Sequence, residues 1–357
     1  MVAQNERRIL LEKYMDLHNK RVLLRDAIPL SMPFTLFVDP TNWCNFKCSF
    51  CPRNGADFHK YAGDYQHMPL SLFEKIVNDI KAFGGKLKVL RLFSLGEPLL
   101  SPHFKDIFQC AVNAEIAERI ELATNGSLLS EEMAEHILET VRHYRGTFYL
   151  RVSIYSVWQE KNLKITKNPI LIETIRENVA RFKRLRDEKG IKNVEIYAKK
   201  LDTFDKENDD FLAMYGGVVD EAAIEEPINW SGAGGGDLRS EIYSAEEISS
   251  MKSKMSPEVC AFPFHTMSIQ SDGTVVCCCV DWSRHTRIGN VREESLMDIW
   301  NGKTHIDFQC QQLAHRRREN LGCKHCEYVP VYEEDNLETT PPEMLVEKAK
   351  QLGLLPS

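Results

Sequence analysis

The sequence has no long hydrophobic run, because no stretch of its 357 residues approaches the ~18 consecutive apolar residues of a membrane-spanning helix. It also lacks an excess of basic residues: its formal net charge is −7. That charge provides no electrostatic footprint for nucleic acid, and no nucleic-acid partner is expected. The N-terminal stretch scatters charges among its apolar residues and lacks the continuous apolar segment of a signal peptide. Neither secretion nor a membrane location is expected.

Cysteine, in contrast, is abundant. The chain has 11 cysteines, an odd number. Without a secretion signal, such a set favours reduced thiols and metal binding over disulfides. We therefore expect a cytoplasmic, metal-binding protein.

From residue 34 onward, short β-branched or aromatic runs alternate with helical segments. Six such strand–helix units predict a parallel sheet with right-handed crossovers, in an α/β fold. Six units are too few for a closed eight-fold barrel, so a partial (β/α)6 TIM-like barrel or a doubly wound sheet is expected. In either architecture chemistry collects at the carboxyl ends of the strands. The expected strands cover residues 34–39, 87–94, 118–124, 147–154, 193–200 and 216–224.

The segments that flank this core differ in composition. A small C-terminal α+β domain is expected after a glycine-rich stretch, and it begins with a hairpin that turns at Asp272-Gly273. The predicted division is an N-terminal amphipathic helix and extension (1–33), the core (34–227), a Gly-rich junction (228–259), the small domain (260–330) and a tail with a helix (331–357).

Three cysteines follow the first expected strand directly. Cys44, Cys48 and Cys51 lie in "TNWCNFKCSFCPRN", at the mouth of the expected barrel. Thiolates bind iron–sulfur clusters, Cu(I) or zinc. A structural zinc site needs four ligands, and no fourth cysteine or histidine follows at the spacing of a zinc finger. Three thiolates on a four-iron cluster would leave one iron open to react.

The C-x-x-x-C-x-aromatic-C pattern resembles the radical S-adenosylmethionine (SAM) superfamily. The resemblance implies that Cys44, Cys48 and Cys51 hold a [4Fe–4S] cluster whose open iron is chelated by SAM. An electron from the cluster then cleaves SAM to a radical that abstracts a substrate hydrogen. Phe50 occupies the aromatic position that lies near the adenine in that family.

Further motifs of the same family follow later strands. "SLGEP" (94–98) is similar to the Gly-Gly-Glu-Pro motif, with Leu95 in place of its first glycine. The resemblance implies that Gly96 and Glu97 meet the SAM ammonium, that Asn125 of "ATNGSLL" lies near SAM, and that Ser153 contacts its carboxylate or ribose. Lys199, in the fifth expected strand, is a second candidate for the carboxylate.

A second set of cysteines resembles the SPASM/twitch auxiliary domain. Counting from Asp272-Gly273 places a ligand on Cys278 rather than on its neighbours. The resemblance implies one auxiliary [4Fe–4S] cluster on Cys260, Cys278, Cys323 and Cys326. A four-cysteine zinc site is the alternative, and no role is assigned to Cys110, Cys277, Cys279 or Cys310.

Polar residues at alternate positions of the fourth and fifth expected strands suggest that the barrel interior binds a ligand. Arg151 and Tyr155 share one strand phase, and Glu195 heads the next row; these three are candidates for the base that an oxidation needs. The long polar loop 52–69 is a candidate for substrate binding.

The expected function is that of a radical SAM oxidoreductase acting on a polyol, aminocyclitol, sugar or sugar nucleotide. Its cysteine spacing is similar to that of twitch enzymes that dehydrogenate aminocyclitols, so the resemblance implies a two-electron oxidation through the auxiliary cluster. Peptide maturation and sugar epimerisation with a cysteine hydrogen donor are the alternatives. The expected partners are a sugar-like small molecule and a reductant such as flavodoxin or ferredoxin.

Overall fold

The computed structural model describes residues 23–227, 229, 238–250, 257–327, 333–351 and 353–354. Most of the predicted N-terminal helix (1–22) and the glycines of the predicted junction (232–236) lie outside the described residues. Within the described residues a short helix, α2 (Leu24–Ala27), precedes the first strand.

One nine-stranded sheet organises the chain, in the order β6-β5-β4-β3-β2-β1-β7-β8-β9. All neighbours from β6 to β7 pair in parallel, and the pairs β7–β8 and β8–β9 are antiparallel. All six strands expected in the core are present, and the α/β fold with a partial TIM-like barrel is confirmed. The strands are β1 (Thr35–Val38), β2 (Leu87–Arg91), β3 (Ala117–Thr124), β4 (Thr147–Ile154), β5 (Val194–Leu201), β6 (Glu221–Glu225), β7 (Thr266–Ile269), β8 (Thr274–Val276) and β9 (Arg287–Asn290).

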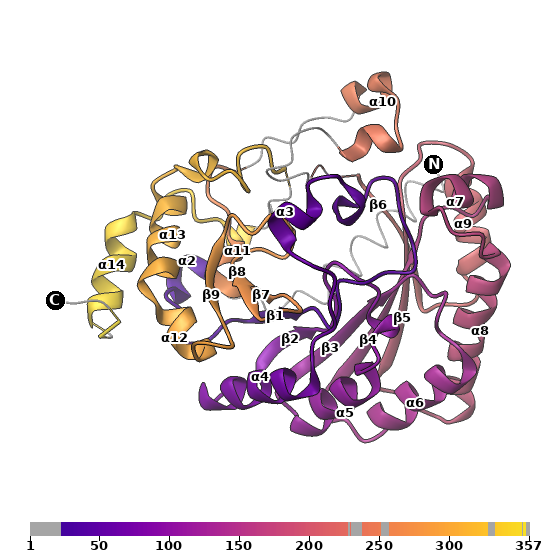
Figure 1. Cartoon of the computed structure of the whole chain (residues 1–357), viewed down its shortest axis with the longest axis horizontal. Coiled ribbons are helices and arrows are strands. Elements are labelled where there is room, and N and C mark those ends of the chain that lie inside the picture. Colours follow the sequence, from indigo (N-terminus) through magenta and orange to yellow (C-terminus); the bar gives the residue numbers. More distant parts are fainter. Residues whose placement is uncertain are drawn as a thin grey trace.

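Helices cover one face of the parallel strands (Figure 1). In α4 the buried residues recur at the helical spacing, as at Phe73, Ile76 and Val77, which gives the helix one apolar stripe toward the sheet. The crossover and rim helices are α3 (Phe58–Ala62), α4 (Leu70–Ala82), α5 (Phe104–Ala114), α6 (Glu131–Val141), α7 (Gln159–Thr166), α8 (Ile172–Glu188) and α9 (Glu207–Tyr215). We call the opposite face of β1–β6 the inner face.

Capping and glycine residues mark several helix ends and turns. Ser130 caps α6, because its hydroxyl accepts a hydrogen bond from Met133 N at 3.2 Å. Gly190 follows α8 with φ +65°, and Gly273 turns the β7–β8 hairpin with φ +93°. Both residues adopt the backbone conformation that glycine tolerates best.

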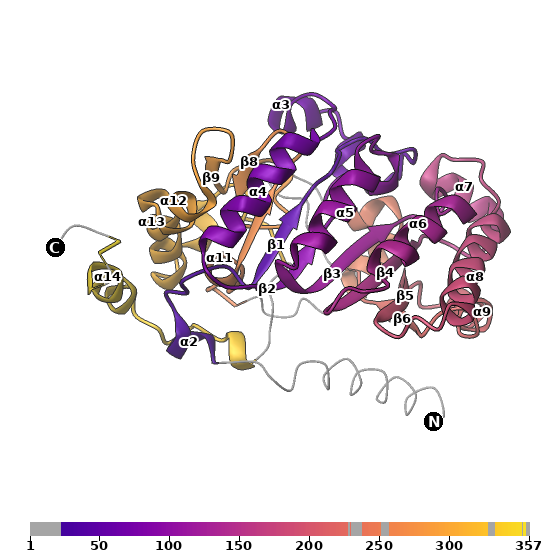
Figure 2. The same cartoon turned by 90° about the horizontal axis from the view of Figure 1, so that it is seen from below.

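The hairpin of the small C-terminal segment extends the core sheet instead of standing apart from it. β7 pairs with β1 over four residues, from Thr35 opposite Thr266 to Val38 opposite Ile269. Figure 2 shows the resulting continuity of the sheet. The remaining helices are α10 (Ala245–Ser250), α11 (Phe262–His265), α12 (Leu296–Asn301), α13 (Lys303–Leu313) and α14 (Pro342–Gln351). Among the described residues no helix is long and apolar enough to span a membrane.

Candidate active site

The three closely spaced cysteines lie in the loop that leaves the carboxyl end of β1. Arg53, itself buried, donates from its guanidinium to the carbonyl oxygens of Phe46 at 2.5 Å and Cys44 at 3.4 Å. Cys51 N donates to Cys48 O at 3.0 Å. The buried Arg53 guanidinium therefore ties the start of the loop, at Cys44 and Phe46, to the chain just after Cys51.

The three thiols are near enough to affect one another. Burial raises the pKa of Cys44 to about 11, and Cys51 adds to that rise. Burial followed by Cys51 and Cys44 raises the pKa of Cys48, whereas burial is the only cause that raises the pKa of Cys51. Because thiolates are the metal ligands, three such thiols require a strong positive charge to ionise, and an iron–sulfur cluster supplies one.

Gly96 is the point at which the loop after β2 touches the cysteine loop. A Cβ at this position would lie 2.0 Å from Thr41 O and 2.5 Å from Trp43 O. Beside it, Glu97 N donates to Trp43 O at 2.8 Å. Only glycine permits this approach of two backbones.

The Glu97 carboxylate lies buried behind that contact. It accepts hydrogen bonds from Thr124 Oγ1 at 2.7 Å, Asn125 N at 2.8 Å and Leu99 N at 3.2 Å. Burial raises the pKa of Glu97 to about 7 although these donors oppose it. In this structure Glu97 ties the loop after β2 to the carboxyl end of β3, and its predicted contact with the SAM ammonium remains a prediction.

Asn125 connects the end of β3 with the cysteine loop. Its Nδ2 donates to Asn45 Oδ1 at 2.9 Å, and its Oδ1 accepts from Ser127 N at 2.9 Å. The sequence-predicted residues Gly96, Glu97 and Asn125 thus meet around the cysteine loop. Their contacts with SAM remain predictions.

Two further predicted residues pack beside the cysteines. The rings of Phe50 and Tyr155 lie 5.7 Å apart between centroids, and Phe46 lies 5.9 Å from Tyr155. Burial, and then the nearby Cys48, raises the pKa of Tyr155. Tyr155 therefore belongs to the wall of the cysteine site, away from the inner face further down β4.

The other predicted polar residues lie on the inner face. Ser153 stands opposite Lys199 in the β4–β5 register. Lys199 Nζ pairs with Glu225 at 2.8 Å, and burial raises the pKa of Glu195. Arg151 pairs with Glu121 at 3.3 Å and reaches Glu225 at 3.8 Å.

Sequence reasoning missed the centre of this network, Glu121. Burial alone would raise its pKa, but Arg91, Arg151 and Arg119 outweigh burial and lower the pKa to about 2. Arg91 and Arg119 each lie 2.8 Å from its carboxylate. The sequence shows that residues 119 and 121 face the same side of their strand. It does not show how that strand pairs with β2 and β4, and that pairing brings Arg91 and Arg151 to Glu121.

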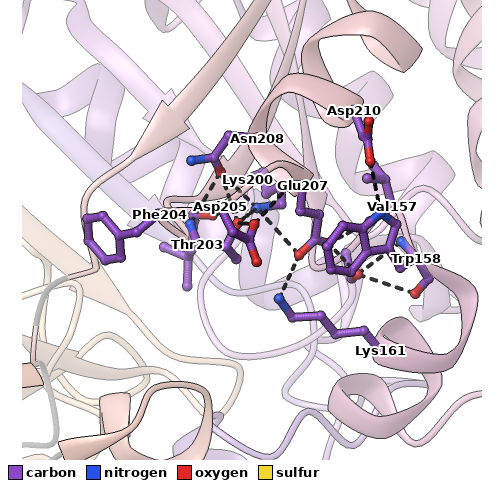
Figure 3. Close-up of polar contacts among 12 residues, drawn as sticks. Val157, Trp158, Lys161, Lys200, Thr203, Phe204, Asp205, Glu207, Asn208 and Asp210 are labelled. Carbon is purple, nitrogen blue, oxygen red and sulfur yellow. Dashed lines mark hydrogen bonds and ion pairs between the residues drawn. The ribbon is translucent and has the colours of Figure 1, made fainter. Parts of the chain in front are cut away.

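A buried polar network, also missed, holds the carboxyl ends of β4 and β5 (Figure 3). Glu207 is fully buried and accepts from Val157 N at 3.0 Å and Lys161 Nζ at 2.6 Å. Lys200 donates to Thr203 Oγ1 at 2.7 Å and Asn208 Oδ1 at 3.1 Å. The network fixes the turn that follows Tyr155 in the chain.

The second cysteine set shares one pocket. Cys260, Cys278, Cys323 and Cys326 all line it, together with Arg317, while Cys277 and Cys279 do not. Arg317 is buried and donates to Cys326 O at 3.1 Å. The four thiols are those that the resemblance to the SPASM domain implied, and their chemistry fits a metal–sulfur cluster. Their assignment as ligands remains a prediction.

The polar loop 52–69 packs onto the C-terminal segment. Phe58 and Ala62 form an apolar cluster with Trp282. Tyr61 lies 6.0 Å from Trp282 and 5.3 Å from His285 between ring centroids. These aromatic side chains connect the loop that contains α3 with the C-terminal segment. Figures 1 and 2 both show α3 beside the strands of that segment.

Two family profiles match the chain. The profile of the radical SAM superfamily matches residues 38–197, and that of the SPASM iron–sulfur cluster-binding domain matches residues 260–327. The first match runs from the end of β1 to the middle of β5, and the second contains all four cysteines of the pocket.

Individual proteins and solved structures are also similar to this chain. A tungsten-containing aldehyde ferredoxin oxidoreductase cofactor-modifying protein of Pyrococcus furiosus is 24% identical, with 77% of this chain and 82% of that protein covered. The GTP 3′,8-cyclase of Aquifex aeolicus is 30% identical over 44% of this chain, which spans less than half (46%) of that enzyme. The crystal structure of BtrN with AdoMet and 2-DOIA has a TM-score of 0.52 at 16% identity, covering 86% and 96% of the two chains. That last likeness shows the fold.

Proposed function

The chain belongs to the radical SAM superfamily and carries a C-terminal SPASM domain, and from this premise we propose that it oxidises a polyol, aminocyclitol, sugar or sugar nucleotide by two electrons. Its cofactors are SAM, a SAM-binding [4Fe–4S] cluster and auxiliary iron–sulfur clusters. When bound, the first cluster and SAM supply a hydrogen-abstracting adenosyl radical, and the auxiliary cluster supplies an electron acceptor. A low-potential flavodoxin or ferredoxin is the proposed reductant.

The observation that carries the proposal is the pocket lined by Cys260, Cys278, Cys323 and Cys326. Four thiolates complete the coordination of one four-iron cluster, so such a cluster has no open position for a substrate and is suited to electron transfer. An oxidation needs an acceptor of this kind. We propose one auxiliary cluster here, held by these four residues.

The placement of three of the four remaining cysteines, Cys110, Cys277 and Cys310, favours oxidation over epimerisation. A hydrogen-atom donor has to reach the substrate on the inner face. Cys110 lies in α5 and Cys310 in α13, both among the helices. Cys277 is fully buried in the apolar core at the end of β8. These positions are poor ones for returning a hydrogen atom to a substrate carbon.

Among the candidate bases, Glu195 suits the role best. Its pKa is raised, first by burial, which favours acceptance of a proton. Arg151 is committed to ion pairs with Glu121 and Glu225. Tyr155 packs against the cysteine loop. Glu195 lies near the amino end of β5, opposite Tyr149, so we propose it as the proton acceptor for a substrate that extends down the inner face from the cysteine site.

The test is an anaerobic incubation of the reconstituted, reduced protein with SAM and candidate polyols. We expect 5′-deoxyadenosine in every reaction that contains SAM and reductant, and with the substrate a product lighter by two hydrogens. A Cys323→Ala/Cys326→Ala variant is expected to cleave SAM without forming that product. If the wild-type protein forms no 5′-deoxyadenosine, the radical function is wrong; if this variant still oxidises the substrate, the role of the auxiliary cluster is wrong.

A further inference from the structure

Three consecutive arginines follow α13, and only the middle one is buried. The side chains of Arg316 and Arg318 are 60% and 51% exposed, and they pair with Glu319 at 2.7 Å and with Glu258 at 3.2 Å. Arg317 is only 1% exposed, and it lines the pocket of the second cysteine set. Burying a charged side chain is costly unless an opposite charge compensates it, so the position of Arg317 needs a physical reason.

The guanidinium group of Arg317 has more hydrogen-bond donors than the surrounding chain uses. Its Nη1 donates to the carbonyl oxygens of Cys323 at 3.4 Å and Cys326 at 3.1 Å. Its Nε and Nη2 are buried and have no hydrogen-bond partner among the described residues. Because a guanidinium has five N–H donors, three of them lack an acceptor. Unsatisfied buried donors cost stability, which points to an acceptor that belongs in the pocket.

Gln312, in the last turn of α13, presents a second donor of this kind. Its side chain is fully buried and lines the same pocket. Its Oε1 accepts a hydrogen bond from Cys260 N at 3.4 Å, while its Nε2 has no partner within the part of the chain that the structure describes. Two different side chains therefore bring unused donors to the pocket, and the sulfur atoms of a cluster are hydrogen-bond acceptors.

The carboxylate that lines this pocket does not compensate Arg317. Asp281 accepts hydrogen bonds from Thr286 N at 2.6 Å, Thr286 Oγ1 at 2.8 Å and Ser283 Oγ at 2.9 Å. These three donors hold the carboxylate within its own loop, and it forms no ion pair with Arg317. Four cluster thiolates would supply the negative charge that a buried guanidinium requires.

We propose that Arg317, assisted by Gln312, donates hydrogen bonds to the sulfur atoms of the auxiliary cluster and raises its reduction potential. Net charge and hydrogen bonds to the sulfurs are among the factors that set the potential of an iron–sulfur cluster. A buried cation favours the reduced state, which carries an additional electron. In the proposed oxidation that electron comes from the substrate radical, which loses a proton and becomes the product. The inference rests on the proposed function and identifies the residues that tune its electron acceptor.

The test is a redox titration, followed by electron paramagnetic resonance, of the full chain carrying Cys44→Ala/Cys48→Ala/Cys51→Ala. In this parent only the auxiliary cluster is expected. Adding Arg317→Gln should make its reduction about tenfold less favourable, a shift of ~59 mV to more negative potential. Gln312→Met keeps the cation and loses one donor, so a smaller shift in the same direction is expected. Arg318→Gln, at the exposed neighbour, is the matched control and keeps the midpoint of the parent.

An unchanged midpoint in Arg317→Gln, or an equal shift in Arg318→Gln, would overturn the inference. Since Arg317 also holds the turn from Cys323 to Cys326, iron analysis accompanies each titration. If Arg317→Gln retains fewer than about four irons, Gln312→Met decides, and an unchanged midpoint in that variant overturns the inference.

The wild-type protein, assayed for oxidation of the substrate, tests the proposed function separately. The expected midpoints without an oxidised product contradict the proposed function alone. An oxidised product together with unshifted midpoints contradicts the role of Arg317 and Gln312 alone.

Discussion

Gly96 shows how much of the candidate site depends on one missing side chain. The loop after β2 and the cysteine loop meet there backbone to backbone, and a methyl group would lie 2.0 Å from Thr41 O. Glu97 follows at once and hydrogen-bonds the end of β3. Three loops thus share one contact, so a small change at residue 96 reaches all the residues predicted to surround SAM.

Replacing Gly96 with alanine is expected to destabilise the apo-protein by about 2–3 kcal/mol, because the clash is with backbone and cannot be relieved by a side-chain rotation. Urea unfolding measures the change. Gly217→Ala is the matched control, since a Cβ there meets nothing within 4 Å, and its effect should stay within about 0.5 kcal/mol. Equal midpoints for Gly96→Ala and wild type would show that the two loops do not meet as described.

Single cysteines could be assigned from sequence more readily than single polar residues. The spacing after Asp272-Gly273 singled out Cys278 among three adjacent cysteines, and only Cys278 of the three lines the pocket. Glu121 carried no such signal, because its importance comes from arginines on two other strands. A motif is local in the chain, whereas an ion-pair network exists only once the strands are paired.

Between elements, Glu121 is the strongest polar connection on the inner face. It joins Arg91 of β2, Arg119 of its own strand and Arg151 of β4. The three guanidinium groups lower its pKa from 4.5 to about 2. A carboxyl whose pKa is lowered by folding stabilises the folded state above its unfolded pKa, and that stabilisation is lost as the pH falls through the folded value.

Glu121→Gln is therefore expected to unfold more easily at neutral pH by about 3 kcal/mol, and to lose less stability than wild type between pH 4.5 and 2. Urea unfolding of the apo-protein across this pH range measures both effects. Glu132→Gln, at an exposed glutamate, controls for a general loss of charge. Parallel acid limbs for wild type and Glu121→Gln would contradict the network.

The elements of the core were predictable because each strand and helix has its own periodicity. The pairing of β1 with β7 was not, since more than 200 residues separate the two strands in the chain and parallel pairing leaves no mark in either. Between β4 and β5 the structure has two helices, α7 and α8, with a break between them. The intervening Pro169 is consistent with that break.

Across the whole molecule, the two cysteine sites lie at opposite ends of adjacent strands. The first site follows the carboxyl end of β1. Cys260 precedes β7, and Cys278 follows β8, which runs antiparallel to β7, so the second site lies beyond the amino end of β7. Because β1 and β7 pair directly over four residues, the sheet itself holds the two sites at a constant separation. A rigid separation suits electron transfer between two clusters.

The central claim is that one chain holds an open cluster on three cysteines and a closed cluster on four. Iron analysis of the anaerobically reconstituted protein, together with that of a Cys44→Ala/Cys48→Ala/Cys51→Ala variant, tests it most directly. We predict about eight irons per chain in the wild type and about four in the variant, with the brown colour retained and no 5′-deoxyadenosine formed from SAM. A variant that is colourless, or that holds zinc in the second site, would contradict the account.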